Sequence, residues 1–156
     1  MNVSNEFFSS DKTLSELTTY QVGAIESAAH RSLRQYKDSL LSEYGITGIE
    51  WYLIGTVADT GTKGARITDL AEVLGTTLGF MTKTVNLLEA KAILLRRANA
   101  KDARSNHVIV SPKYRKTTLK IEAHLRSELR KSVYGLVTRE ELLTYIRVME
   151  KFSKIK

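Results

Sequence analysis

The chain has 156 residues, of which 42% are hydrophobic and 26% charged, so it is long enough to bury a core as one domain or as two closely packed subdomains. It contains no cysteine, which excludes disulfides, thiolate metal sites and thiol redox switches, and no apolar run approaches the ~20 residues that cross a membrane. Since the N-terminus also lacks the pattern of a signal peptide, we expect a cytoplasmic protein without a membrane partner.

The net charge of +7 is distributed unevenly along the chain. Residues 1–60 carry four basic and eight acidic side chains (−4), residues 61–111 carry eight and four (+4), and residues 112–131 carry seven and two (+5). A positive field that begins near residue 61 favours a polyanionic partner, bound with an affinity that falls with salt. The alternative is a surface whose charge only keeps the protein in solution.

Two helices are predicted in the first third of the chain. Apolar residues that step by three or four from Val22 to Leu40 predict a helix that ends near Tyr44-Gly45. A second helix should open after Thr47 and turn its apolar residues Leu53, Ile54 and Val57 inward.

The next segment predicts two short helices joined by a tight turn. The first should begin at Thr68, whose hydroxyl can cap it, and end at Gly75, a residue suited to the left-handed conformation that closes helices. Thr76 and Thr77 then supply the cap of a helix from about Leu78 to Ala90. That helix should turn inward Met81, Val85 and Leu88.

The opposite face of this second helix should be free to meet a ligand. Its N-terminal end offers unpaired N–H groups and a positive dipole, which suit a phosphate. The free face comprises Gly79, Phe80, Thr82, Lys83 and Asn86, with Thr77 and Leu78 at the start of the helix.

A charged β-hairpin is predicted directly after this helix. A strand Ile93–Arg97 should lead through a polar loop, Asn99–Asn106, to a second strand, His107–Val110, with His107 at a strand edge. Ala92 stands before the first strand, so we expect the helix to end without a left-handed residue there. Helix pairs alone arise often by chance, and the hairpin makes the pattern specific.

The C-terminal third predicts two more amphipathic helices. Pro112 should set the first turn of a helix with an apolar stripe from Tyr114 to Leu136, and Thr138–Glu141 is a capping box that opens the last helix. Stripes this long need another surface to cover them, which a two-fold dimer supplies. The alternative is that they close on the core of their own monomer.

These features together resemble the MarR family of winged helix-turn-helix transcription regulators. The resemblance rests on Thr68–Ala71, on Thr82-Lys83 followed by Leu88-Glu89, and on Asp102–Arg104, and it extends from about Tyr20 to the C-terminus. It implies a mainly α fold with a small β-hairpin wing. The implied domains are an N-terminal arm and dimerisation helix (1–45), a winged helix-turn-helix DNA-binding domain (46–111) and C-terminal dimerisation helices (112–156).

The resemblance places the second helix of the pair in the major groove of DNA and the hairpin, or wing, at the neighbouring minor groove. It implies that Arg104 is the minor-groove contact and that Asp102 orients it, the alternative being a solvated salt bridge in a loop. We therefore expect DNA contacts from Thr77, Leu78, Gly79, Phe80, Thr82, Lys83 and Asn86 of the helix and from Arg97, Lys101, Asp102 and Arg104 of the wing.

The start of the second helix departs from the family pattern, because Leu78, Gly79 and Phe80 stand where relatives often have small polar or basic residues. Hydrogen-bonded reading of bases there should be limited. Leu78 or Phe80 could instead meet a thymine methyl group, or Phe80 could be partly buried against the first helix.

The function implied is that of a homodimeric regulator, a repressor or less often an activator, that binds a pseudopalindromic operator in double-stranded DNA. A small-molecule effector, of the aromatic acids that some relatives bind, would release it. Tyr36, Trp51 and Tyr52 could line its pocket, unless they are simply core residues. Two other functions stay open: a non-specific architectural DNA-binding protein, and a winged-helix protein-interaction module.

An enzymatic function is not expected. The histidines His30, His107 and His124 lie in different predicted elements, and the chain has no glycine-rich phosphate loop, G-x-S-x-G or H-x-x-x-H motif. We therefore expect no catalytic residue, no metal and no cofactor, the alternative for the metal being a zinc site formed by His30, His124 and a carboxylate.

Overall fold

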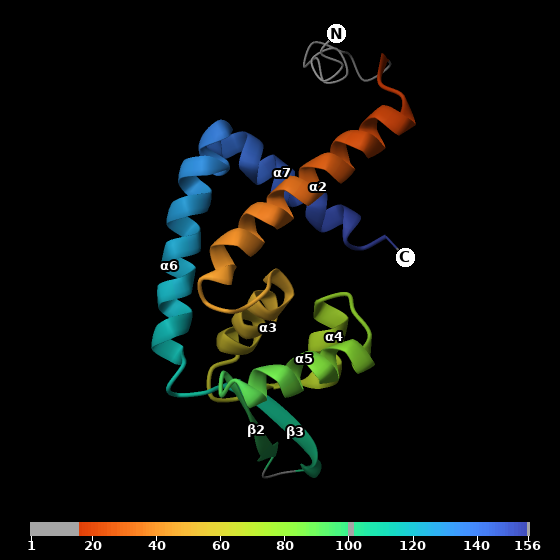
Figure 1. Cartoon of the computed structure of the whole chain (residues 1–156). Coiled ribbons are helices and arrows are strands. Elements are labelled where there is room, and N and C mark those ends of the chain that lie inside the picture. The colour runs from red at the N-terminus through yellow and green to blue at the C-terminus, as the bar shows by residue number, and fades with distance from the viewer. Residues whose placement is uncertain (1–15, 100–101, 156) are drawn as a thin grey trace. The chain divides into compact units, whose positions relative to one another are not determined.

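The computed structural model describes residues 16–99 and 102–155, and the side chains of these except 98–99 and 102–106. Internal contacts divide the chain into two units, residues 1–48 and 49–156, which are described separately. The structure confirms the predicted fold class, because it is mainly helical with one small antiparallel sheet (Figure 1). In the described ranges, no helix is both long and apolar enough to span a bilayer.

The described part of the first unit is mainly helix α2 (Thr19–Ser42), which confirms the predicted N-terminal helix. The helix begins after Thr18, whose backbone N–H donates a hydrogen bond to Gln21 Oε1 (3.0 Å). Near its C-terminus, Asp38 Oδ1 accepts a hydrogen bond from the backbone N–H of Gly48 (2.9 Å), the residue at which the next helix starts. This carboxylate thereby satisfies one of the N–H groups that a helix N-terminus leaves open.

The second unit is built on helix α3 (Gly48–Asp59), which buries Leu53, Ile54 and Val57 as predicted. The same helix buries a charge, because Glu50 is 4% exposed. The Glu50 carboxylate accepts a hydrogen bond from Lys91 Nζ (3.2 Å), at the end of helix α5 (Leu78–Ala90). A buried carboxylate needs such a partner, so this ion pair joins α3 to the C-terminal end of α5.

The predicted helix pair is present as α4 (Ile67–Val73) and α5 (Leu78–Ala90). The bounds of α5 agree with the prediction, whereas the start of α4 was predicted wrongly. Its N-cap is Arg66 rather than Thr68, because a short strand continues to Arg66 and the chain turns into the helix directly after it. Thr68 lies in the first turn, where its hydroxyl contacts Asp69 Oδ1 (3.2 Å).

Both helices of the pair end in the same way. Gly75 (φ +60°) closes α4, and Ala92 (φ +57°) closes α5. In each case two backbone hydrogen bonds turn back onto the last helical turn: Gly75 N to Glu72 O and Thr76 N to Ala71 O, and correspondingly Ala92 N to Glu89 O and Ile93 N to Leu88 O. The expectation that α5 ends without a left-handed residue is therefore wrong, since these bonds and the burial of Ile93 hold an alanine in that conformation.

Replacing Ala92 with glycine should stabilise the protein by about 1 kcal/mol, because glycine adopts a positive φ without the clash that its Cβ gives alanine. The expected result is a rise of roughly 2–4 °C in Tm for a chain of this size, measured by thermal unfolding at fixed protein concentration. Ala90→Gly is the control, since Ala90 lies within α5 and glycine there should lower Tm. A lower Tm for Ala92→Gly would contradict the prediction.

The sheet contains three antiparallel strands in the order β1-β3-β2, from β1 (Ala65–Arg66), β2 (Leu94–Asn99) and β3 (Asp102–Val110). Strand β1 was not predicted. The loop expected over Asn99–Asn106 was predicted too long, because backbone pairing continues past the apolar residues to the pairs Ala98–Asn106 and Asn99–Asp102. His107 lies on β3, the central strand, and not at an edge as expected.

The last elements are α6 (Arg115–Ser132), a 3₁₀ turn η2 (Tyr134–Leu136) and α7 (Arg139–Phe152). The apolar stripe of α6 is buried at Thr118, Ile121 and Leu125. The helix begins at Arg115 and ends at Ser132, so the prediction that it has Pro112 in its first turn and extends to Leu136 is wrong. The capping box that opens α7 is confirmed: Thr138 N donates to Glu141 Oε2 (2.7 Å), and Glu141 N donates to Thr138 Oγ1 (3.2 Å). The backbone hydrogen bond from Thr138 holds the pKa of Glu141 below its usual range.

Candidate nucleic-acid interface

The face of α5 that points away from the core carries the candidate contact residues. Met81, Val85 and Leu88 are fully buried and fix the rotation of the helix about its axis. Thr77 caps the helix, its Oγ1 accepting a hydrogen bond from Phe80 N (3.3 Å), as predicted. The residues left exposed on the other side are Leu78, Gly79, Phe80, Lys83, Asn86 and Leu87, of which Leu87 was not among the predicted contacts.

The N-terminal turn of α5 presents apolar rather than polar side chains. Leu78 is 52% exposed and Phe80 is 46% exposed. Thr82 is half-buried, and its hydroxyl donates to the carbonyl of Leu78 within the same helix (2.8 Å). Apolar contact at the first turn and a cation one turn later, Lys83, are therefore what this end of α5 offers to a duplex.

Asn86 is exposed but not free, and this contact was missed in the sequence. Arg96 Nη2 of β2 donates a hydrogen bond to Asn86 Oδ1 (2.6 Å), while Arg96 Nη1 lies 3.2 Å from Glu89 Oε2. Because Arg96 uses the amide oxygen, the NH₂ group of Asn86 points away as a donor. Strand alternation could have revealed the contact, since Arg96 pairs with the buried Val108 and so lies on the inner face of the sheet.

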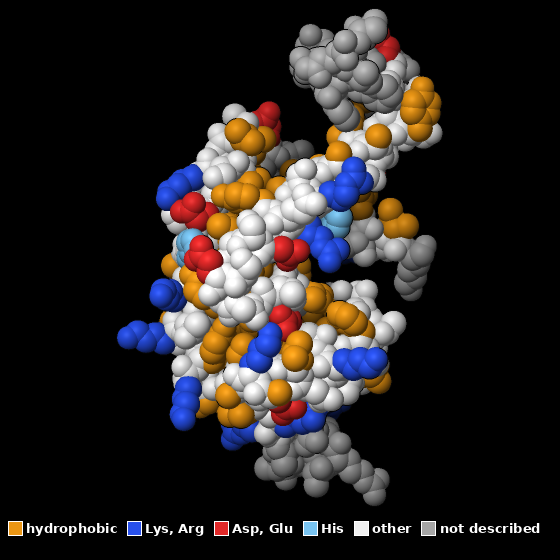
Figure 2. Space-filling model, viewed as in Figure 1, with side chains coloured by type: hydrophobic (Ala, Val, Ile, Leu, Met, Phe, Trp, Pro, Cys, Tyr) orange, Lys and Arg blue, Asp and Glu red, His pale blue; other side chains and the backbone are white. Residues whose placement is uncertain are grey.

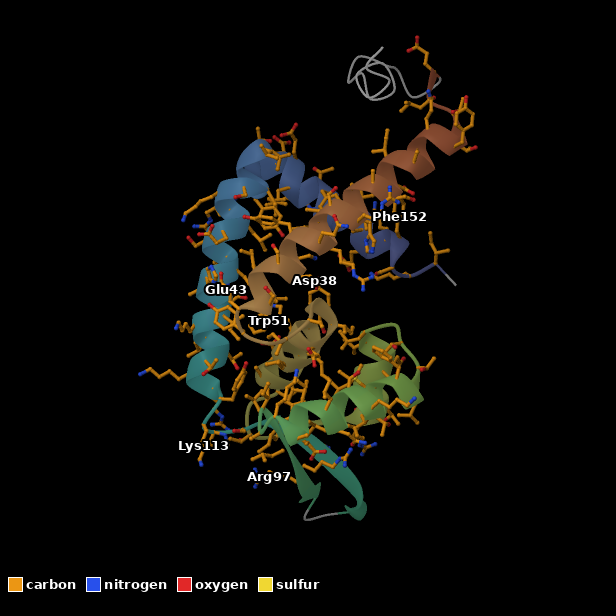
Figure 3. All side chains as sticks on the ribbon, viewed as in Figure 1. Asp38, Glu43, Trp51, Arg97, Lys113 and Phe152 are labelled. Carbon is orange, nitrogen blue, oxygen red and sulfur yellow. The ribbon has the colours of Figure 1, made fainter. Side chains whose placement is uncertain are left out.

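The wing residues are described only in part. Arg97, labelled in Figure 3, is exposed, and its Nη1 donates to the carbonyl of Thr62 in the loop before β1 (3.3 Å). Lys101 lies outside the described residues. Asp102 and Arg104 belong to β3, but their side chains lie outside the described set, so the expected orientation of Arg104 by Asp102 stays a prediction.

The three aromatic residues expected around an effector lie on two helices, α2 and α3. Tyr36 is half-buried on α2, while Trp51 (labelled in Figure 3) is half-buried and Tyr52 is 40% exposed on α3. Since Trp51 and Tyr52 are consecutive on a helix, their side chains leave it about 100° apart. Their use as a pocket stays a prediction. Among the side chains that are described, no three His, Asp or Glu lie close enough together to hold a metal ion.

Basic and apolar side chains share the surface of this segment. Figure 2 shows Lys and Arg side chains interspersed with hydrophobic ones and a few Asp or Glu side chains over the part of the molecule that holds α4 and α5. Such a surface differs from an enzyme cleft, in which a few polar groups converge on one enclosed point. It suits an extended polyanion with an apolar component.

Known proteins share part of this sequence pattern and the greater part of this fold. Residues 44–105 match the model of the MarR family. The fold is similar to that of AbsC, a MarR family transcriptional regulator from Streptomyces coelicolor, with 17% identity, a TM-score of 0.75 and coverage of 88% of this chain and 95% of AbsC. No curated protein sequence matches the chain.

Two further structures of similar fold contain DNA. One is a mutant of MarR from E. coli complexed with operator DNA, at 18% identity and a TM-score of 0.75, covering 84% of this chain and 92% of that chain. The other is the complex of MepR from S. aureus with DNA, also at 18% identity and a TM-score of 0.75, covering 90% of this chain and all of the other.

Proposed function

We propose that the protein is a homodimeric, sequence-specific regulator of transcription. Its residues 44–105 match the MarR family, whose members are transcriptional regulators and not enzymes. DNA binding and transcription regulation follow from the family. We further propose that the protein is a repressor, that it binds a pseudopalindromic operator, and that a small aromatic acid releases it from the DNA.

The exposed surface of α5 supports sequence-specific binding to DNA. The buried residues of this helix fix its rotation, so that Leu78, Phe80, Lys83 and Asn86 all stay exposed, and the Thr77 cap orders its N-terminal turn. A rigid helix with its N-terminal end exposed is the form in which helix-turn-helix proteins enter a major groove. The contacts assigned to α5, and those of Arg97, Lys101, Asp102 and Arg104 in the wing, belong to this proposal.

A second observation supports the homodimer. Helix α7 contains no buried residue in the described structure, although Ile146, Met149 and Phe152 repeat along one side and are 53%, 45% and 50% exposed. Leu142 and Ile146 also line a hollow beside α6. Exposed apolar stripes of this length mark protein interfaces. A second copy of the chain is the partner we propose, with residues 1–45 and 112–156 as the dimerisation regions.

Selection of binding sites from a randomised duplex library at near-physiological salt tests the proposal. An inverted repeat with half-sites about one helical turn apart is the expected result. Recovery of featureless or only AT-rich sequences would favour an architectural protein, for which the apolar Leu78 and Phe80 provide a rationale. A complete lack of enrichment would favour a protein-interaction module.

Replacing Lys83 with alanine should weaken binding to every duplex by a similar factor, roughly tenfold, because Lys83 offers a point charge to a phosphate at an exposed position of α5. Fluorescence anisotropy with two duplexes of different sequence measures the factor for each. Lys151→Ala, which removes an exposed lysine from α7, is the control and should leave both affinities unchanged. Unchanged binding of Lys83→Ala would remove this residue from the interface.

A further inference from the structure

The sheet brings three basic side chains into one row across its strands. Arg66 of β1 lies directly opposite His107 of β3, and His107 lies directly opposite Arg97 of β2. Directly opposed residues of antiparallel strands project from the same face of a sheet. Arg66, His107 and Arg97, which we call the cationic row, therefore share one face although they come from three different strands.

The cationic row lies on the outer face of the sheet. The neighbouring pair Leu94–Val110 is buried, as is Val108, the residue after His107, and these side chains belong to the inner face. On the outer face, Ile109 is buried beside the loop that holds Gly64 and His107 is half-buried, whereas Arg66 and Arg97 are exposed. The row is thus accessible to a ligand that approaches the sheet from outside, whereas Arg96 faces α5.

The charge of the row is not neutralised by any carboxylate whose position is described. The ion pairs given for the described side chains involve none of the three residues. Arg97 Nη1 donates to the carbonyl of Thr62, which fixes the guanidinium and leaves its other N–H groups to donate elsewhere. Arg66 is also the N-cap of α4, so the row is joined directly to the helix-turn-helix.

We propose that the cationic row binds the sugar-phosphate backbone of duplex DNA beside the base pairs that α5 reads. The two guanidinium groups leave strands two spacings apart, about 10 Å, with an imidazole between them. Planar guanidinium groups suit bidentate hydrogen bonds to phosphate oxygens, and an imidazole N–H can add a third donor between them. This inference rests on the proposed function and extends the wing contact of Arg97 across the sheet to His107 and Arg66.

The dependence of DNA affinity on salt concentration tests whether the cationic row contacts phosphate groups. The probe is a fluorescein-labelled duplex of mixed sequence, about three helical turns long, bound by the full chain and measured by anisotropy over a salt series. Each phosphate contact that is lost should lower the slope of log K against log salt by about 0.9. Arg66→Gln and Arg97→Gln should each show this change, with roughly three- to tenfold weaker binding near 0.1 M salt.

Two variants distinguish the loss of a phosphate contact from a structural effect of the substitution. Arg97→Lys keeps the cation and should retain the wild-type salt slope, whereas Lys151→Gln removes a cation from α7 and should leave slope and affinity unchanged. A weaker affinity of Arg66→Gln and Arg97→Gln with an unchanged slope would assign the row a structural role and overturn the proposal.

The outcomes distinguish this inference from the proposed function. If Lys83→Ala weakens binding while both arginine variants bind as the wild type does, the row does not contact DNA. Arg97 is then removed from the wing contacts, and the rest of the proposed function stands. If the wild-type protein binds no duplex at low salt, the proposed function fails, and the row fails with it.

Discussion

Replacing Gly64 with alanine should lower the free energy of unfolding by about 3 kcal/mol, because the substitution combines a strained backbone with a steric clash. Gly64 has φ +74°, and an added Cβ would lie 2.8 Å from the carbonyl oxygen of Val108 and 2.9 Å from Cγ2 of Ile109. Both neighbours belong to the central strand, which cannot move without breaking its pairing with β1 and β2. The expected fall in Tm is roughly 6–12 °C.

Gly61→Ala is the matched control for this experiment. Gly61 has a similar φ, +59°, but an added Cβ there would meet nothing within 4 Å. Its replacement should therefore cost only the conformational part, about 1 kcal/mol. Urea unfolding of both variants at one protein concentration, followed by circular dichroism, gives the difference. Equal losses would show that the close approach of Gly64 to the central strand contributes nothing to stability.

Replacing Ile146 with aspartate should convert the proposed dimer into monomers and weaken binding to a two-half-site duplex by about 100-fold or more, since each monomer then holds the DNA through one reading helix only. Ile146 is 53% exposed in a single chain, so a charge at this position disturbs little within the monomer. In a dimer interface the same carboxylate would be buried without a partner. Sedimentation velocity measures the mass, and anisotropy measures the affinity.

The polar side of α7 supplies the control for that prediction. Thr144 is exposed and lies in a stripe with Glu140, Arg147 and Lys151. Thr144→Asp adds the same charge to the same helix and should leave the mass of a dimer unchanged. A dimeric Ile146→Asp variant with normal DNA affinity would show that the apolar side of α7 is not the dimer interface.

Helix α5 was predicted well because its signals are local. The cap at Thr77 and the spacing of Met81, Val85 and Leu88 lie within the helix itself, and the structure places them as the sequence indicated. The capping box of α7 is local in the same sense, since Thr138 and Glu141 stabilise each other within one turn. Elements whose determinants lie within a few residues can be read from a single sequence.

The features that were missed depend on residues distant in the chain. Strand β1 has only two residues, and it exists because Ala65 pairs with Val108 of β3. The length of the hairpin follows from pairing of polar residues, which have no periodic apolar pattern. Ala92 adopts a left-handed conformation because hydrogen bonds at the end of α5 and the buried Ile93 require it. At each of these places, contacts within the folded structure outweigh the local conformational preference of the residue.

The clamp of Arg96 on Asn86 affects how the DNA preference of this protein could be re-engineered. Asn86 is the kind of exposed helix residue that is usually randomised alone, but its amide oxygen is already bound by the guanidinium of a strand residue. A library at position 86 would thus be biased towards side chains that can accept a hydrogen bond from this guanidinium, which also pairs with Glu89 (3.2 Å). Randomising residues 86 and 96 together removes that bias and makes the pair, rather than the single residue, the unit of design.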